Sequence, residues 1–348
     1  MLSPGDRRLI GASALLTAAS GLTRYVASGR VIPFVVSALA LAALAALVGR
    51  SVERLGDRLG SGATGVLQSA LGNLPELFFG IFALRQGLVT VVQATLVGSI
   101  LANVLLVLGV AFIAGGLRHG TQRFSAEGAR LVVLLLLLAV AVLVVPTVTA
   151  HLHGGAAHHE RALSDVAAVV LLAVFCLSVP ASLQPAAETV PHQGPTWSLG
   201  MVMGGLLGSA IGAAAVSDWF VSSLRPALAA LHISEAFAGL VIVAIAGNAV
   251  ENVVGVQLAL RNRMDYALSV TLQSPVQIAL ALTPALVLLS NVIGGAPLTL
   301  VLPTVLVAAL AITTIVAVVV VVDGESTWLE GVCLVGLYAV IAAAFWWG

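Results

Sequence analysis

The sequence predicts an all-α polytopic membrane protein with about eleven transmembrane helices, arranged as one helix followed by two inverted five-helix repeats. Composition is the first reason: 60% of the 348 residues are hydrophobic and only 9% are charged, a balance that suits lipid rather than water. The second reason is that apolar runs long enough to cross a ~30 Å hydrocarbon core recur along the chain. The third is a polar motif that occurs twice inside such runs.

Polar breaks separate eleven apolar runs, each of which is a predicted span. We expect an N-terminal helix within residues 1–30 and a first repeat of five spans over 31–180. A polar, proline-containing linker at 181–195 leads into a second repeat of five spans over 196–348. The predicted spans are 9–26, 31–48, 62–84, 88–114, 128–149, 163–180, 197–217, 233–260, 266–289, 297–322 and 328–347.

The two predicted repeats share a polar motif. Gly72-Asn73-Leu74-Pro75-Glu76 in the first repeat corresponds to Gly247-Asn248-Ala249-Val250-Glu251 in the second, an offset of 247 − 72 = 175. The same offset, without gaps, places Ser99 on Ser274. Matched polar residues are rare by chance in apolar runs, where one aliphatic residue more often meets another. The matches therefore indicate an internal duplication.

Both acids of the motif are predicted to lie deep in the membrane. Glu76 precedes Arg85 by nine residues and Glu251 precedes Arg261 by ten, which is roughly 13 and 15 Å of helix. An acid at that depth costs at least a few kcal/mol, so it usually serves a function. A single membrane acid can instead hydrogen-bond a neighbouring helix, but two matched acids favour a shared functional site.

The arginines set the predicted orientation. All 15 basic residues are arginine, and ten of them fall on the N-terminal side of the predicted spans. The positive-inside rule then makes the N-terminus cytoplasmic and the C-terminus external, in the inner membrane of a bacterial cell. The third and eighth helices run in opposite directions, so the two acidic motifs are expected to face each other at mid-membrane. A net charge of zero gives no surface for nucleic acid.

The doubled motif supplies the predicted cation and proton ligands. An asparagine and a glutamate three residues apart share one face of a helix. Proline removes a backbone donor and glycine permits bending, so carbonyl groups released there can face an ion. The predicted ligands are Glu76, Glu251, Asn73 and Asn248, of which Glu76 and Glu251 are the metal-binding acids. The predicted helix breaks are Gly72, Pro75 and Gly247.

The helices that follow each motif add a second polar face. The secondary candidates are Ser99, Asn103, Ser274, Gln277 and Gln273. Together the candidates form a set of oxygen donors without thiol or imidazole, which hard cations prefer, Ca²⁺ above all. The serines have helix packing as an equally good alternative role.

Competition between ions predicts the activity. Two carboxylates balance one divalent ion, whereas desolvation and mutual repulsion favour their protonated forms when that ion is absent. Ca²⁺ and H⁺ then compete for the same oxygens, and exchange results if the site opens to one side at a time. We expect no cofactor beyond the transported Ca²⁺ and H⁺, the lipid bilayer as the surrounding partner, and an oligomeric state that the sequence leaves open.

At these residues the sequence resembles the calcium/proton exchangers, a branch of the calcium:cation antiporter superfamily. The resemblance covers nearly the whole chain and includes the Gly-Asn-x-x-Glu motif in both halves and the segment Gly98–Gly109. It implies ten core helices, alternating access, and Glu76 and Glu251 as shared Ca²⁺/H⁺ ligands. It also implies that the helices at 31–48 and 197–217 slide past the core as gates.

Several residues depart from the family pattern and leave the choice of cation open. They are Leu74, Pro75, Asn252, Gln273 and Pro275. Exchange of Na⁺, K⁺ or Mn²⁺ by the same fold is therefore the alternative. A cation channel is disfavoured because paired acids suit occlusion better than conduction. An enzyme is disfavoured because the chain has no Gly-rich phosphate loop and no metalloprotease His-Glu motif.

Four histidines follow the fifth predicted helix. They are His151, His153, His158 and His159. We expect them to lie in a solvated loop, since Gly154 and Gly155 interrupt it, with binding of a transition metal as the alternative.

Overall fold

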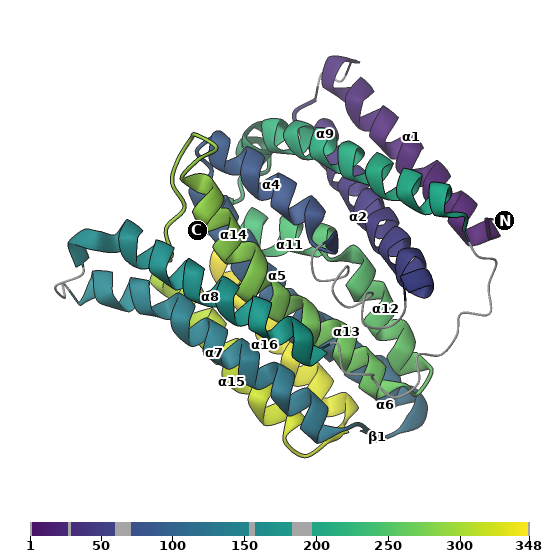
Figure 1. Cartoon of the computed structure of the whole chain (residues 1–348), viewed down its shortest axis with the longest axis vertical. Helices are drawn as coiled ribbons and strands as arrows, with labels where there is room; N and C mark the ends of the chain where they lie inside the picture. Colours follow the sequence, from purple (N-terminus) through teal and green to yellow (C-terminus); the bar gives the residue numbers. More distant parts are fainter. Residues whose placement is uncertain (1, 27–28, 60–70, 153–156, 183–196, 347–348) are drawn as a thin grey trace. The chain divides into compact units, whose positions relative to one another are not determined.

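The computed structural model describes residues 2–26, 29–59, 71–152, 157–182 and 197–346, which are almost entirely helical (Figure 1). Within this part of the chain, eight helices are long and apolar enough to cross a membrane, and a bent pair of shorter helices raises the number to nine. The predicted class, an all-helical membrane protein, is confirmed. The count of eleven spans and the inverted arrangement of two repeats stay predictions.

The described chain forms two compact units, each of which combines two stretches of sequence. Unit 1 contains Met1–Gln86 and Val174–His232, and unit 2 contains Gly87–Ala173 and Ile233–Gly348. Each unit draws residues from both predicted repeats, and one boundary between the units falls inside helix α8 (Glu160–Ser182). The repeat boundaries at 30, 180 and 195 stay predictions, and most of the linker lies outside the described residues.

Four helices make up most of the described part of unit 1, to which the C-terminal end of α8 also belongs. Helix α2 packs against both α1 and α9, and α4 packs against α9 (Figure 1). Phe220 of α9 stacks on Phe34 of α2 at 5.1 Å between ring centroids and meets Phe79 of α4 at 5.8 Å. The helices are α1 (Pro4–Val26), α2 (Ile32–Leu59), α4 (Leu74–Arg85) and α9 (Leu199–Leu231).

Two predicted spans differ from the helices of unit 1. The run 9–26 belongs to α1, but α1 is not among the eight helices that are long and apolar enough to cross a membrane. Helix α9 has 33 residues where the prediction has 21 (197–217), because the helix continues through the polar residue Asp218 and through Pro226 near its C-terminal end. Of the predicted span 62–84, the residues up to 70 lie outside the described part.

The buried centre of unit 2 consists of helices with π-helical turns in the middle. The first, α5–η1–α6, runs unbroken for 31 residues, and the second, α13–η4–α14, for 27 residues. The first comprises α5 (Val89–Leu101), η1 (Ala102–Val107) and α6 (Leu108–His119). The second comprises α13 (Met264–Gln277), η4 (Ile278–Leu282) and α14 (Thr283–Ser290).

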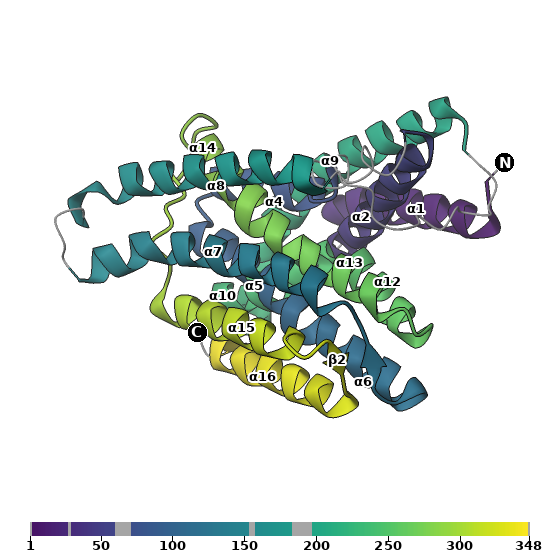
Figure 2. The same cartoon turned by 60° about the horizontal axis from the view of Figure 1, so that its bottom comes forward.

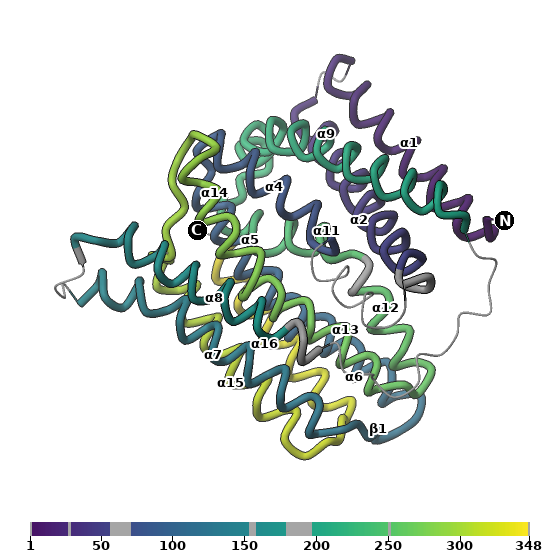
Figure 3. Tube along the Cα trace, viewed as in Figure 1, coloured from purple at the N-terminus to yellow at the C-terminus, as the bar shows by residue number. Residues whose placement is uncertain are grey.

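The predicted span at 233–260 is broken. Its two halves meet at an angle of 60°, and they can be followed in Figure 3 as the tubes labelled α11 and α12. The halves comprise α10 (Glu235–Phe237), η3 (Ala238–Val243) and α11 (Ala244–Gly247), followed by α12 (Ala249–Leu260).

The outer layer of unit 2 is strongly apolar. Helix α7 packs on α15, and α16 packs on α6 (Figure 2). Exposed leucines and isoleucines on these helices suit contact with lipid chains. The elements are β1 (Gln122–Arg123), α7 (Ala126–His151), η2 (Ala157–His159), α15 (Thr304–Val321), β2 (Glu325–Ser326) and α16 (Trp328–Trp346), with β1 antiparallel to β2.

The histidine-rich segment is more ordered than the predicted loop. His151 belongs to the last turn of α7, where its Nδ1 lies 2.9 Å from the carbonyl oxygen of Thr147. His158 and His159 belong to the 3₁₀ turn η2, which leads into α8. His153 lies outside the described residues.

Candidate functional site

Two glycines bring α5 and η3 into backbone contact. A Cβ atom added to Gly98 would collide with the carbonyl oxygen and Cα of Leu240, and one added to Gly239 would lie 2.5 Å from the carbonyl oxygen of Val91. Only glycine allows two helices to approach this closely. The crossing places Ser99 next to the short helix α11.

Asn248 is the centre of a buried hydrogen-bonded cluster in unit 2. Its Nδ2 donates to Ser99 Oγ at 3.0 Å and to the carbonyl oxygen of Ala244 at 2.9 Å. Its Oδ1 accepts from Asn103 Nδ2 at 3.0 Å and from Ser274 Oγ at 3.1 Å. Four of the residues that the sequence singles out are therefore in contact, although they come from α5, η1, α13 and the end of α11. We call Ser99, Asn103, Asn248 and Ser274 the polar cluster.

The hydrogen bonds within the polar cluster leave one side-chain oxygen, Asn103 Oδ1, without a donor among the described residues. Asn248 uses both amide hydrogens and accepts two hydrogen bonds, so its side chain is saturated. Asn103 donates to Asn248 and to the carbonyl oxygen of Ser99. The Oδ1 atom of Asn103 is buried and accepts no hydrogen bond within the described part of the chain. A buried amide oxygen without a donor is a ready ligand for a cation.

The helix break at Asn248 lies within the second acidic motif. Helix α11 ends at Gly247, Asn248 adopts a turn conformation, and α12 begins at Ala249. Glu251 is the third residue of α12; its side chain lies outside the described part. A carboxylate in the first turn of a helix is stabilised by the positive end of the helix dipole.

The first motif has a similar local structure in unit 1. Gly72 and Asn73 form a turn, and α4 begins at Leu74 with Pro75 in its first turn. Glu76, also in that first turn, is only 6% exposed. Proline fits the first turn of a helix because the N–H groups there have no partner within the helix. The motif thus places a buried carboxylate in the first turn of a helix.

The remaining candidates lie on α13 near the polar cluster. Gln277 is buried at the last residue of α13, and Gln273 is half-buried one turn earlier. Gln273 makes no hydrogen bond among the described residues. Each of the two long central helices turns π-helical beside the cluster: η1 contains Asn103 and η4 starts after Gln277. Such turns occur often at functional sites.

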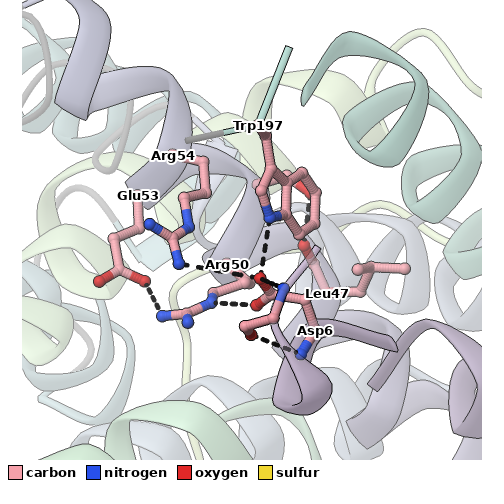
Figure 4. Close-up of polar contacts among 8 residues, drawn as sticks. Asp6, Leu47, Arg50, Glu53, Arg54 and Trp197 are labelled. Atoms are coloured by element: carbon pink, nitrogen blue, oxygen red, sulfur yellow. Dashed lines mark hydrogen bonds and ion pairs between the residues drawn. The ribbon is translucent and has the colours of Figure 1, made fainter. Parts of the chain in front are cut away.

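Sequence reasoning missed a second buried polar group, which lies in unit 1 (Figure 4). Trp197 Nε1 donates to Asp6 Oδ2 at 2.9 Å, and Arg50 Nε donates to Asp6 Oδ1 at 3.0 Å. Arg54 Nη2 lies 3.8 Å from Asp6 Oδ2. Asp6 is 2% exposed. This Asp6 cluster connects the first turn of α1 to α2 and to Trp197, which lies two residues before α9.

A sequence signal for the Asp6 cluster exists. Ser3 and Asp6 form a capping box at the start of α1: Asp6 N donates to Ser3 Oγ at 3.1 Å and Ser3 N donates to Asp6 Oδ2 at 3.2 Å. Burial raises the pKa of Asp6, but hydrogen bonds from Trp197, Arg50 and Ser3 outweigh that effect and hold the pKa well below its ordinary value. The pattern Ser-Pro-x-Asp indicates the cap, whereas nothing local indicates Trp197.

Known proteins resemble the chain over nearly its full length. The profile of the family described as "Sodium/calcium exchanger protein" matches residues 30–184 and 201–347. A Ca²⁺/H⁺ antiporter of Aphanothece halophytica is 33% identical over 333 residues, which covers 90% of this chain and 89% of that protein. The chain belongs to the calcium/proton exchanger family of the calcium:cation antiporter superfamily. The resemblance inferred from the doubled motif is thus confirmed.

Other members of this exchanger family agree. The Ca²⁺/H⁺ antiporter ChaA of Bacillus subtilis is 33% identical and covers 90% of this chain and 91% of its own length. Among solved structures, native YfkE superposes with a TM-score of 0.83 at 28% identity, covering 97% of this exchanger and 99% of YfkE. The H⁺/Ca²⁺ exchanger CAX shares the fold, with a TM-score of 0.77 at 17% identity. The exchanger is therefore a multi-span membrane transporter.

Proposed function

We propose that the protein is a secondary active antiporter that exchanges Ca²⁺ for H⁺ across the cytoplasmic membrane by alternating access. Relatives at 33% identity are Ca²⁺/H⁺ antiporters of bacteria, and the match covers about nine-tenths of each chain. The direction follows from energetics, since protons that enter down their gradient can drive Ca²⁺ out.

The proposed ligands are the two acids of the doubled motif. Glu76 and Glu251 bind one Ca²⁺ or take up protons in its place, and Asn73 and Asn248 stand beside them in the motif. The sequence duplication supports the pairing of the two acids. The burial of Glu76 supports this role, because a carboxylate removed from water is costly unless an ion or a proton neutralises its charge.

The observation that carries the proposal is the polar cluster around Asn248. It joins the break before Glu251 to α5, η1 and α13 through hydrogen bonds of 3.0–3.1 Å. It also leaves Asn103 Oδ1 without a donor among the described residues. A fixed helix break, an amide oxygen and an adjacent acid together form one half of a hard-cation site.

The test is flux through the purified full-length protein reconstituted in vesicles. We expect radiolabelled Ca²⁺ to accumulate when a pH gradient is imposed, and imposed Na⁺ or K⁺ gradients to have no effect. Calcium flux that follows Na⁺ and ignores pH would refute proton coupling. Movement of another cation without any Ca²⁺ flux would refute calcium as the substrate, and a steady unitary current would indicate a channel.

Another cation is the second candidate. Asn252, one residue after Glu251, has a buried Oδ1 that accepts no hydrogen bond among the described residues, while its Nδ2 donates to the carbonyl oxygen of Ile245 at 3.4 Å. Calcium/proton exchangers usually have histidine here. An oxygen in place of a nitrogen changes which ions suit the site, so Na⁺, K⁺ and Mn²⁺ are tested as competitors of Ca²⁺.

A further inference from the structure

A basic cleft lies where α6 and α12 end in unit 2. The cleft has a volume of about 520 Å³ and is lined by Arg118, His119, Gln257, Leu260 and Arg261. No acidic residue is among its described lining residues. Both arginines are exposed, and neither forms an ion pair within the described part of the chain. Two guanidinium groups from different helices thus line one concave surface, with no counter-charge among the residues that the structure describes.

Hydrogen bonds hold the two walls of this cleft together. A ring nitrogen of His119 lies 2.9 Å from the carbonyl oxygen of Leu260. Gln122 Nε2 donates to the carbonyl oxygen of Ala259 at 3.0 Å and to Asn262 Oδ1 at 2.8 Å. The backbone that carries the arginines is therefore fixed before any ligand arrives, which lowers the entropic cost of binding.

The helix ends alone do not neutralise the arginines. Each helix C-terminus carries about half a negative charge, so the ends of α6 and α12 together supply about −1. Arg118 and Arg261 together supply +2. The cleft therefore keeps about one unit of positive charge.

We propose that this cleft binds a phosphate group, with the head group of an anionic phospholipid as one source and free phosphate as the other. Guanidinium groups bind phosphate oxygens through paired hydrogen bonds. Basic pockets between the ends of transmembrane helices suit anionic lipid head groups. Gln257 precedes Arg261 by four residues, one helical turn, and adds two amide donors on the same face. The proposal does not depend on which cation the protein transports.

The experiment titrates the full-length protein in detergent and follows its melting temperature. The probes are short-chain phosphatidylglycerol, short-chain phosphatidylcholine and inorganic phosphate, because a ligand that binds the folded state raises the melting temperature. We expect phosphatidylglycerol to stabilise the wild type, and the double variant Arg118→Gln/Arg261→Gln to bind it at least tenfold more weakly. The matched control Arg7→Gln/Arg8→Gln removes two exposed arginines from α1 and is expected to bind like the wild type.

Each outcome decides the proposal. Stabilisation by phosphatidylglycerol but not by inorganic phosphate supports a lipid head group, and equal stabilisation by both supports free phosphate as a ligand. Failure of both to bind, or equal weakening in the two double variants, overturns the proposal. If the cleft variant does not fold, Gln257→Glu replaces it, since an acid one turn from Arg261 supports the helix but repels phosphate. Undiminished binding by Gln257→Glu also overturns the proposal.

Discussion

Asn103 and Asn248 are joined by a hydrogen bond of 3.0 Å although 145 residues separate them in the chain. Asn103 donates the bond and keeps its own carbonyl oxygen without a donor among the described residues. The pair therefore fixes a helix break on one side and presents an unused oxygen on the other. The proposed exchange activity depends on this arrangement.

Asn248→Ala is expected to destabilise the protein and to stop exchange. The change leaves the amide of Asn103 and the hydroxyl of Ser274 without their buried acceptor. Each unsatisfied group costs about 1–3 kcal/mol, so we expect a total of about 2–6 kcal/mol. Thermal unfolding and Ca²⁺ flux measure the two effects. The exposed Asn291 provides the control, and a loss no larger than that of Asn291→Ala would contradict a central role for Asn248.

Glu76→Gln and Glu251→Gln are each expected to abolish Ca²⁺/H⁺ exchange without preventing membrane insertion. Glutamine keeps the size of the side chain but can neither carry a negative charge nor release a proton. Proton-driven uptake into vesicles should fall by at least a hundredfold, about 2.7 kcal/mol. The control is Glu127→Gln, an exposed acid in the first turn of α7. Exchange that survives either substitution would remove that acid from the site.

Gly98→Ala is expected to disrupt unit 2. The new methyl group would collide with the backbone of Leu240, which cannot move aside as a side chain can. We expect a loss of about 1–3 kcal/mol in stability, together with reduced Ca²⁺ flux, because Ser99 follows directly. Gly336→Ala on α16 is the control, since a Cβ there meets no atom within 4 Å. Equal melting temperatures for the two variants would refute the close approach of α5 and η3.

Asp6→Asn is expected to lower stability near neutral pH by about 2–3 kcal/mol, since hydrogen bonds to a charged group are worth about 1.5–3 kcal/mol. The folded pKa of Asp6 lies below its ordinary value of 3.8, so the charged form favours folding. This contribution is complete above about pH 4 and is lost as the pH falls toward the folded pKa. The difference in melting temperature between wild type and variant should therefore shrink below about pH 4.

Two variants sharpen the test of Asp6. Trp197→Phe removes one hydrogen-bond donor and keeps the carboxylate, so it should cost about half as much as Asp6→Asn. Glu127→Gln removes an exposed acid and should leave the pH dependence of melting unchanged. If the melting temperature of the wild type depends on pH in the same way as that of Asp6→Asn, the folded protein does not stabilise the charged form of Asp6.

The sequence predicts the helical class and much of the site because both have strong local signals. Long apolar runs can only be helices when the backbone must satisfy its own hydrogen bonds in lipid. The duplication singles out Ser99, Asn248 and Ser274 as candidate ligands. The structure places these three in one cluster with Asn103. The pairing of Glu76 with Glu251 is still a prediction.

The features that sequence reasoning missed depend on contacts between distant segments. No local pattern distinguishes Gly239 from other glycines, because its role comes from Val91 on another helix. Trp197 reads as an ordinary aromatic residue at a helix start until Asp6 is found beside it. The π-helical turns leave no mark in the hydrophobic pattern either, since η1 and η4 are as apolar as the α-helical residues around them.

The crossing of Gly98 and Gly239 has a mechanical consequence. Where side chains separate two helices, changes of rotamer can absorb a small displacement, but two backbones in direct contact have no such slack. The contact between α5 and η3 should therefore act as a stiff joint. Any force that reaches one of these helices is then passed to the other with little loss, and the polar cluster beside the joint moves as one piece.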